Sequence, residues 1–228
     1  MVRPRDSVAR CSVELAEIYK SLGRAETADA HLAAALQNEG DPKLRASILI
    51  DRLDLLLAAN KSKKAANVFA QARRLVAQEG SKEQAVDLHM KLGDHQWVKR
   101  AHFNALQRYA VAAVESLSIS GEAYSEVTGH ISGRLLRMSG KNRSRRIEAL
   151  QNRLSRWLVT QVSPRQLSVV SRIVLWPLKV VSQLTRRLQE GELPSDALFE
   201  EVVGAELRGL GQSAERDGLG EDVRRAKR

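Results

Sequence analysis

Three histidines, His89, His95 and His102, are the residues that most invite a chemical role, because imidazole serves both as metal ligand and as acid–base group. Their spacings of six and seven residues do not bring three imidazoles to one metal ion. The chain has no HExxH pair, no phosphate-cradling glycine loop and no nucleophile elbow. Cys11 is the single cysteine, which excludes a cysteine-built zinc site, and we expect it in the core. We therefore predict no catalytic residue, no cofactor and no metal, and a protein that is not an enzyme.

Arginine offers a second kind of chemistry, the binding of phosphate groups. A basic patch in the middle of the chain, opposed only by Glu148, consists of Arg134, Arg137, Lys141, Arg143, Arg145, Arg146, Arg153 and Arg156. Clustered guanidinium groups bind phosphate well, and a nearby helix start adds to their positive field. No aromatic residues are interleaved for base stacking and no DNA-reading motif is present. Nucleic-acid binding is therefore an alternative function, and a solvated basic face explains the same residues.

The composition favours a helical chain. Of its 228 residues only 4% are aromatic, and five prolines are too few to interrupt many helices. The net charge of +10 is compatible with nucleic acid, anionic lipid or an ordinary soluble scaffold. No apolar run follows Met1, and the most apolar segment carries Arg172 and Lys179. We predict no signal peptide, no membrane span and a cytoplasmic protein.

The elements that position these groups are clearest at residues 15–36. Apolar residues at helical spacing form one stripe before Gly23 and a second after it: Leu15, Ala16, Tyr19 and Leu22, then Ala28, Leu32, Ala35 and Leu36. Gly23 accepts the positive φ that ends a helix, and alanines allow close approach. The pattern predicts an antiparallel helix pair that needs neighbours of its own kind to bury its stripes.

This hairpin resembles the tetratricopeptide repeat (TPR), a helix pair that recurs about every 34 residues. With Ala9 as first position, the characteristic positions of the family are filled by Leu15, Ala16, Tyr19, Gly23, Ala28, Leu32 and Ala35. A second repeat matches over 46–78, with Leu53, Leu56, Asn60, Ala65, Phe69 and Ala72; Arg52 departs from the apolar seventh position. A third, degenerate repeat is predicted over 79–112. It has a capping box at Ser81 and Gln84, its turn at Gly93 and a long second helix over 96–117.

The resemblance implies an all-α fold, a right-handed α-solenoid of antiparallel helix pairs with divergent C-terminal helices. We expect repeats over 1–118 (9–42, 46–78 and 79–112), a basic helical hairpin over 119–162, apolar and capping helices over 163–210 and a disordered tail over 211–228. Pro177 is expected to kink or split the apolar helix near Trp176. A short last helix is expected over 196–208, with Phe199, Val203 and Leu207 on its inner side.

In TPR proteins the first helix of each repeat lines a groove that holds a partner's segment. The resemblance places Glu17, Lys20, Ile50, Asp51, Asp54, Leu57, Asp87 and Lys91 in this groove. Acids predominate, so the Lys/Asn/Arg clamp by which some relatives grip acidic chaperone tails is not carried over. We predict a basic or helical partner segment, held by charge and by the apolar anchors Ile50 and Leu57. The competing interpretation is that the acids only solvate an exposed helical face.

The predicted function is that of a non-enzymatic adaptor, scaffold or assembly factor with a protein partner. One alternative is binding of nucleic acid through the basic patch. The other is a fixed subunit of a larger complex, docked through the apolar helix Val169–Leu184, which otherwise belongs to the core.

Overall fold

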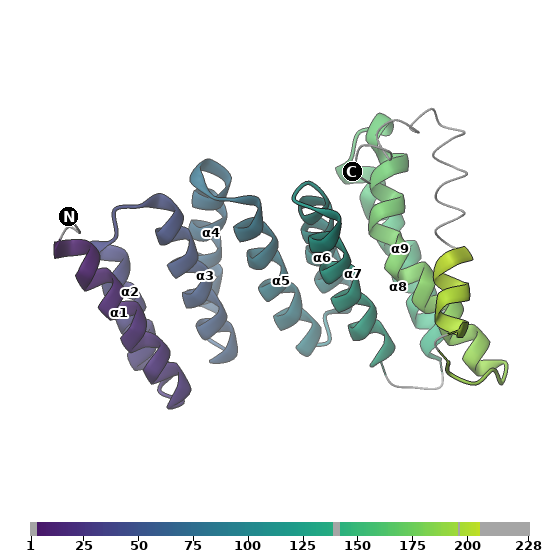
Figure 1. The fold of residues 1–228 in the computed structure, drawn as a ribbon, viewed down its shortest axis with the longest axis horizontal. Helices are drawn as coiled ribbons and strands as arrows, with labels where there is room; N and C mark the ends of the chain where they lie inside the picture. Colours follow the sequence, from purple (N-terminus) through teal and green to yellow (C-terminus); the bar gives the residue numbers. More distant parts are fainter. Residues whose placement is uncertain (1–3, 139–141, 196, 206–228) are drawn as a thin grey trace. The chain divides into compact units, whose positions relative to one another are not determined.

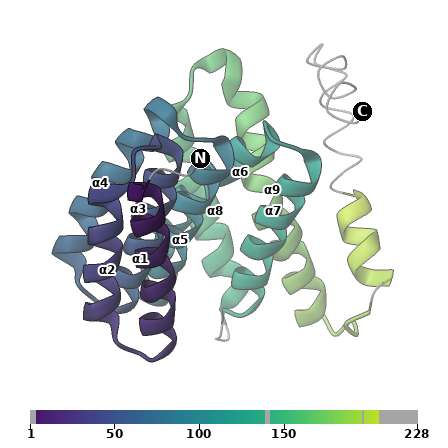
Figure 2. The ribbon, with the colours of Figure 1, turned by 60° about the vertical axis from the view of Figure 1, so that its left-hand side comes forward.

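The computed structural model describes residues 4–138, 142–195 and 197–205, and this part of the chain is helical and contains no strand (Figure 1). The helices are α1 (Pro4–Ser21), α2 (Ala25–Asn38), α3 (Pro42–Ala58), α4 (Ser62–Glu79), α5 (Lys82–Val98), α6 (His102–Leu117), α7 (Gly121–Leu136), α8 (Arg143–Gln161) and α9 (Pro164–Gln189). A further helical segment covers 197–205. Neighbouring helices pack as antiparallel pairs, as α1 with α2 and α3 with α4 (Figures 1 and 2). The all-α prediction is confirmed.

The chain divides into two compact units, Met1–Arg108 and Tyr109–Arg228. The division falls inside α6, whereas the sequence placed the end of the repeats at residue 118. Lys141 and the predicted tail over 211–228 lie outside the described residues.

Three helix pairs are joined by turns of one geometry. The turn residues Gly23, Asn60 and Arg100 have positive φ angles of 71°, 57° and 60°. The next residue donates its N–H to a carbonyl five residues back, from Arg24 to Tyr19, from Lys61 to Leu56 and from Ala101 to Gln96, at 2.8–2.9 Å. This is the Schellman ending of a helix, in which a left-handed residue lets the chain reverse.

The residues at corresponding positions after each turn face inward. They are Ala28, Leu32 and Ala35, then Ala65, Phe69 and Ala72, then Ala105, Tyr109 and Ala112; all are buried except Phe69, which is partly buried. In the first two pairs, α1 with α2 and α3 with α4, the small residues let the second helix lie close to the first, and the bulky residue between them fills the remaining space.

The turn at Arg100 corrects the predicted third repeat. Gly93, predicted as its turn, is buried inside α5, and α6 begins at His102 instead of Gln96. Glycine is a weak helix former, so a single sequence favours a turn there. Burial on a packed face overrides that preference, and Arg100 takes the left-handed conformation although its Cβ opposes it.

The predicted helix starts at Asp41 and Ser81 are confirmed. Asp41 Oδ1 accepts a hydrogen bond from the backbone N–H of Lys43 at 2.8 Å, directly before Pro42. At Ser81, the side chain accepts from the N–H of Gln84 while Gln84 Oε1 accepts from the N–H of Ser81. Both caps satisfy backbone donors that have no partner within the helix.

In the first unit, α1 meets α2 through small residues. Ala9 and Ala16 of α1 are almost fully buried, as are Ala28 and Ala35 of α2. Leu15 and Leu22, predicted on this inner stripe, are instead 40% and 64% exposed, and Cys11, predicted in the core, is exposed. The helix is rotated so that its small side chains face α2, because this allows the two backbones to approach more closely. The long side chains are left outside.

In the second unit, α9 packs against α7 and α8 and runs unbroken through Pro177. Of the two outcomes predicted for Pro177, a kink or a split, the split does not occur. A proline has no N–H for the carbonyl four residues earlier, which is that of Ile173. The hydroxyl of Tyr124 on α7 donates to this carbonyl at 2.9 Å. A side chain from a neighbouring helix thus replaces the missing helical hydrogen bond.

The last helical segment turns inward a face rotated by about one residue from the one predicted. Val203 packs against this core as expected, and Leu207 lies outside the described residues. Leu198 and Val202 are buried against Val180 and Leu184 of α9, whereas Phe199 is 50% exposed. The prediction for Phe199 is therefore wrong by one residue, which is about a quarter turn of a helix.

Among the described helices, α9 is the one whose length and composition would allow it to cross a membrane. The most apolar stretch of 18 residues in this helix has a mean hydropathy of 1.3, and 39% of that stretch is buried. Core helices of soluble proteins meet the same criterion. Between Val169 and Leu184 seven residues are buried and nine are partly buried, so one side of this helix belongs to the core of the second unit.

Candidate functional site

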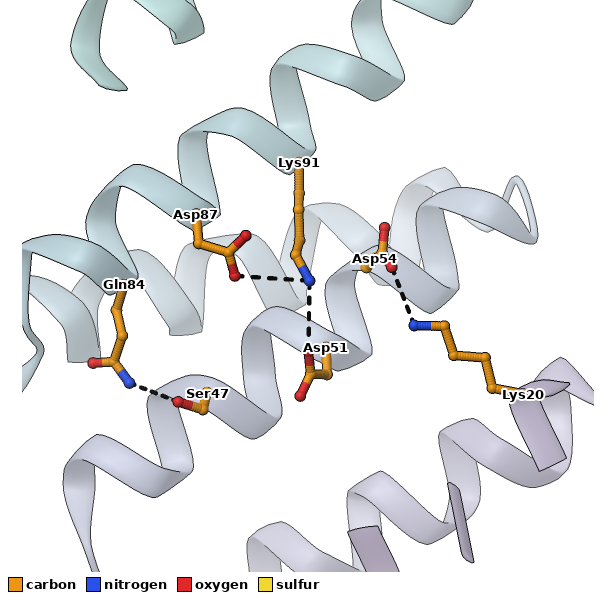
Figure 3. A network of polar contacts seen from close by, with 7 residues as sticks. All are labelled: Lys20, Ser47, Asp51, Asp54, Gln84, Asp87 and Lys91. Atoms are coloured by element: carbon orange, nitrogen blue, oxygen red, sulfur yellow. Dashed lines mark hydrogen bonds and ion pairs between the residues drawn. The ribbon is translucent and has the colours of Figure 1, made fainter. Parts of the chain in front are cut away.

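A network of charged side chains crosses the first helices of the hairpins in the first unit, from α1 through α3 to α5 (Figure 3). Lys20 Nζ of α1 lies 3.3 Å from Asp54 Oδ2 of α3. Lys91 Nζ of α5 lies 3.5 Å from Asp51 Oδ1 of α3 and 3.7 Å from Asp87 Oδ2. The structure therefore brings five of the predicted groove residues together on one face.

Gln84 ties α5 to α3 beside this network. Its Nε2 donates to Ser47 Oγ at 2.7 Å (Figure 3). It also donates to the carbonyl of Lys43 at 2.7 Å. Glu17 of α1 is exposed and near enough to Asp51 for its charge to act on that carboxyl. Four carboxylates, those of Glu17, Asp51, Asp54 and Asp87, thus share two ammonium groups.

The pKa values show how well these charges compensate one another. Burial raises the pKa of the Asp51 and Asp87 carboxyl groups, although the charge of Lys91 pulls both downward. Burial likewise opposes the charge of Lys91, yet the three aspartates together raise the pKa of its ammonium group. Lys91 is therefore well compensated, whereas desolvation outweighs attraction at Asp51 and Asp87. A further cation close to Asp51 and Asp87 would therefore stabilise the charged form of both carboxylates.

An open cleft of about 690 Å³ adjoins the network between α1 and α3. Its lining residues are Ala9, Arg10 and Val13 of α1, Glu39, Gly40 and Asp41 of the following connection, and Leu44, Ser47, Ile48 and Asp51 of α3. Asp51 belongs to both the cleft and the network. Leu44 is 52% exposed and offers an apolar surface beside the three acids.

The predicted apolar anchors are not available in this cleft. Ile50 is 1% exposed and Leu57 is 7% exposed, and both belong to the core formed with Leu53, Ala65 and Leu88. The prediction that they contact a partner is wrong. Apolar residues occupy seven of the ten positions from Ile48 to Leu57 in α3, so periodicity alone does not separate the groove face from the core.

Leu44, Glu39 and Asp41 were missed as cleft residues. Leu44 lies in the first turn of α3, outside the apolar run, and Glu39 and Asp41 precede the helix. The signal for Leu44 in the sequence is an isolated leucine between Lys43 and Arg45. An isolated leucine of this kind is expected on a surface.

Arg52, which departs from the TPR pattern, has a structural role. It is paired with Asp29 of α2, and both side chains are largely shielded from solvent. The ion pair joins the first hairpin to the second where the pattern has an apolar contact.

The basic patch is divided between α7, α8 and the connection between them. Arg143 Nη1 donates to the carbonyl of Leu136 at 2.9 Å and so caps the end of α7. Arg134 lies on α7 near His130, and Arg137 follows the end of that helix. The remaining four arginines are exposed along α8: Arg145, Arg146, Arg153 and Arg156. At about 100° per residue they occupy one side of that helix.

A second exposed feature, also missed in the sequence, runs along α1. Its members, spaced three and four residues apart, are Val8, Cys11, Leu15, Ile18 and Leu22. This stripe lies on a different side of α1 from Ala9 and Ala16, which face α2. Within the described residues, no group of three or more His, Cys, Asp or Glu side chains is placed to hold a metal ion.

Comparison with known proteins assigns no family to this chain, since no protein-family model, curated protein or solved structure matches it.

Proposed function

We propose that this protein is a non-enzymatic adaptor whose TPR-like hairpins hold a segment of another protein in the cleft between α1 and α3. The observation that carries the proposal is the open cleft of about 690 Å³ beside a face with excess carboxylates. The common turn geometry and the matching inward positions after each turn support a TPR-like, solenoidal assignment of the hairpins.

The chemistry of the cleft favours a basic segment with an apolar side chain. Glu39, Asp41 and Asp51 present carboxylates at its rim, and Asp51 is a group that would gain from a further cation. Leu44 and Val13 offer the apolar contact. A ligand with Lys or Arg on either side of an apolar residue satisfies both requirements.

Selection from a random peptide display library tests this proposal. Peptides selected on the wild-type protein are measured against Leu44→Asp and Asp51→Lys by isothermal titration calorimetry. We expect enrichment of basic peptides with one apolar residue, and at least about tenfold weaker binding to each variant. Leu44 is exposed and Asp51 is not in the core, so both variants should fold.

Glu14→Lys is the matched control, because Glu14 is an exposed acid of α1 that does not line the cleft. It changes the net charge as much as Asp51→Lys does and should leave binding unchanged. Equal losses in Glu14→Lys and Asp51→Lys, or no loss in Leu44→Asp, would contradict binding in this cleft.

A second candidate function is binding of a nucleic acid through α8. The specific observation in its favour is the exposed row of Arg145, Arg146, Arg153 and Arg156, spaced along about 16 Å of helix. Replacing the four with Gln should abolish retention on immobilised DNA while leaving peptide binding in the cleft intact. Retention equal to that of the wild type would exclude this function.

A further inference from the structure

A second cluster of charged and aromatic side chains lies in the first unit, where α4, α5 and the start of α6 come together. The guanidinium carbon of Arg108 lies 5.2 Å from the centre of the Phe69 ring. The His89 ring meets the same phenyl ring edge to face, with centroids 6.3 Å apart. The Phe69 ring thus contacts both a guanidinium group and an imidazole, and so keeps the two groups near each other.

Arg73 lies four residues after Phe69, on the same face of α4, and adds a further positive charge beside this cluster. Burial and the nearby charge of Arg73 both lower the pKa of Arg108. Burial, Arg108 and Arg73 lower the pKa of His89 to about 4. No carboxylate of the described chain is among the groups that shift either pKa. The cluster therefore concentrates positive charge without a compensating anion from the described chain.

One ring nitrogen of His89 lacks a hydrogen-bond partner. Its Nδ1 is buried and has no hydrogen-bond partner within the part of the chain that the structure describes. Buried polar atoms are almost always hydrogen-bonded, so an orphaned one beside two guanidinium groups calls for an explanation. A bound anionic group would compensate the charges and bring a partner for this nitrogen.

We propose that Arg73 and Arg108, with His89 beside them, form a binding site for a phosphate group. The site uses α4, α5 and α6, shares no residue with the cleft between α1 and α3, and does not depend on the function proposed for that cleft.

Phosphate fits the cluster better than a carboxylate does. Two guanidinium groups balance the two negative charges of a phosphate monoester, whereas a carboxylate leaves one of them uncompensated. The Phe69 ring holds the Arg108 guanidinium group over its face, and the fork of N–H donors on this group suits a tetrahedral oxyanion. The ligand is inorganic phosphate or the phosphoryl group of a larger molecule.

Titration followed by NMR of the histidine side chains tests the site. Inorganic phosphate, N-acetyl-phosphoserine amide and acetate are added separately to the full chain at constant ionic strength. We expect both phosphate compounds to shift the signals of His89 saturably, and to raise its pKa from about 4 because a bound anion favours the imidazolium. Acetate should bind at least about tenfold more weakly.

The two phosphate compounds distinguish the sources of the ligand. Equal affinities identify a site for the free ion, and tighter binding of the phosphoserine derivative identifies a site for a phosphorylated partner. Both results support the proposal.

Arg73→Gln is the principal variant, because Arg73 is exposed and its loss should not disturb the core. It should weaken phosphate binding about tenfold. Arg108→Lys keeps the charge but removes the fork, and should weaken binding to a similar degree. Arg74→Gln is the matched control, since Arg74 is exposed on the same helix but shifts neither pKa, and it should bind as the wild type does.

The proposal is overturned if phosphate leaves the His89 signals unchanged up to about 20 mM, a concentration at which an affinity worth only about 3 kcal/mol is already detectable. Equal weakening in Arg73→Gln and Arg74→Gln also overturns it, because that result indicates general attraction by the charge of the protein.

Discussion

Tyr124 and Pro177 act as a pair in the second unit. The hydroxyl of Tyr124 donates to the carbonyl of Ile173 that Pro177 leaves without its helical partner. Burial raises the pKa of this hydroxyl to about 12, as expected for a group surrounded by protein. The partnership explains why a proline inside α9 does not end the helix.

This pair makes a prediction about stability. Tyr124→Phe should lower the free energy of unfolding by about 1–3 kcal/mol, because it leaves a buried carbonyl without a donor. In the Pro177→Ala background the amide of residue 177 supplies the donor, so the same change should cost at least about 1 kcal/mol less. Urea unfolding of the four proteins measures the coupling. Equal costs in both backgrounds would show that the hydroxyl does not serve this carbonyl.

His89 makes the stability of the first unit depend on pH. Its pKa of about 4 lies below the ordinary value of 6.5, mainly because it is buried and also because Arg108 and Arg73 are near. The unfolded chain therefore takes up a proton first as the pH falls. Stability is complete above about pH 6.5 and declines toward about pH 4, by up to about 3 kcal/mol.

The prediction is that His89→Phe removes this decline. Urea unfolding of both proteins between about pH 7 and about pH 4 should show the wild type losing stability relative to the variant as the pH falls. The raised pKa values of Asp51 and Asp87 act in the opposite direction, but they are present in both proteins and cancel in the comparison. Parallel curves would contradict a buried neutral His89.

At the scale of the helix pair, the three turns share a geometry but not a residue type. A side chain at Gly23 would meet nothing within 4 Å, so only its φ of 71° favours glycine. Asn60 tolerates a left-handed φ through its short polar side chain, whereas Arg100 adopts it against the usual preference. The three turns therefore store different amounts of backbone strain.

The comparison of the three turns predicts that substitutions at Arg100 and at Gly23 change the free energy of unfolding in opposite directions. Arg100→Gly should raise the free energy of unfolding by about 0.5–1 kcal/mol, because it relieves the left-handed strain. Gly23→Ala should lower it by about 1 kcal/mol, and Asn60→Gly should lie near zero. Chemical denaturation of the single variants measures the order. A destabilising Arg100→Gly would mean that the arginine side chain contributes more than its backbone strain costs.

On the scale of the whole molecule, acidic and basic side chains are unevenly distributed along the chain. The net charge is +10, yet the network and the cleft in the first unit carry more carboxylates than ammonium groups. The exposed arginines of α8 belong to the second unit. The positive field of the chain attracts a polyanion at long range and repels a basic segment, which only the local acids attract.

The two candidate functions should therefore respond differently to salt. Raising the salt from about 50 mM to about 200 mM should weaken DNA binding about a hundredfold if α8 makes about four phosphate contacts. The same change should alter the affinity of a basic peptide less than about threefold, because salt screens the general repulsion together with the local attraction. Fluorescence anisotropy with labelled ligands measures both slopes. A steep loss of peptide binding would show that general electrostatics dominates in the cleft.

Much of the helical architecture could be predicted from local patterns. The turns at Gly23 and Asn60 and the caps at Asp41 and Ser81 depend on residues a few positions apart, and the structure confirms these caps. Gly93 misled the prediction because a buried glycine within a helix and a glycine that ends one look alike in a single sequence. The two kinds of glycine differ in how they pack against other helices. This packing depends on residues that are distant in the chain, so a local pattern does not show it.

The sequence by itself determined that the chain is helical and that its first two hairpins turn at Gly23 and Asn60, and the TPR resemblance placed Asp51, Asp54, Asp87 and their lysines on one face. Only the tertiary structure decided which leucines are covered. It buried Ile50 and Leu57, exposed Leu15, Leu22 and Leu44, and placed Tyr124 beside Pro177. The reason is that helical periodicity specifies the angle between side chains on one helix, whereas the rotation of that helix is set by how closely its neighbours can approach.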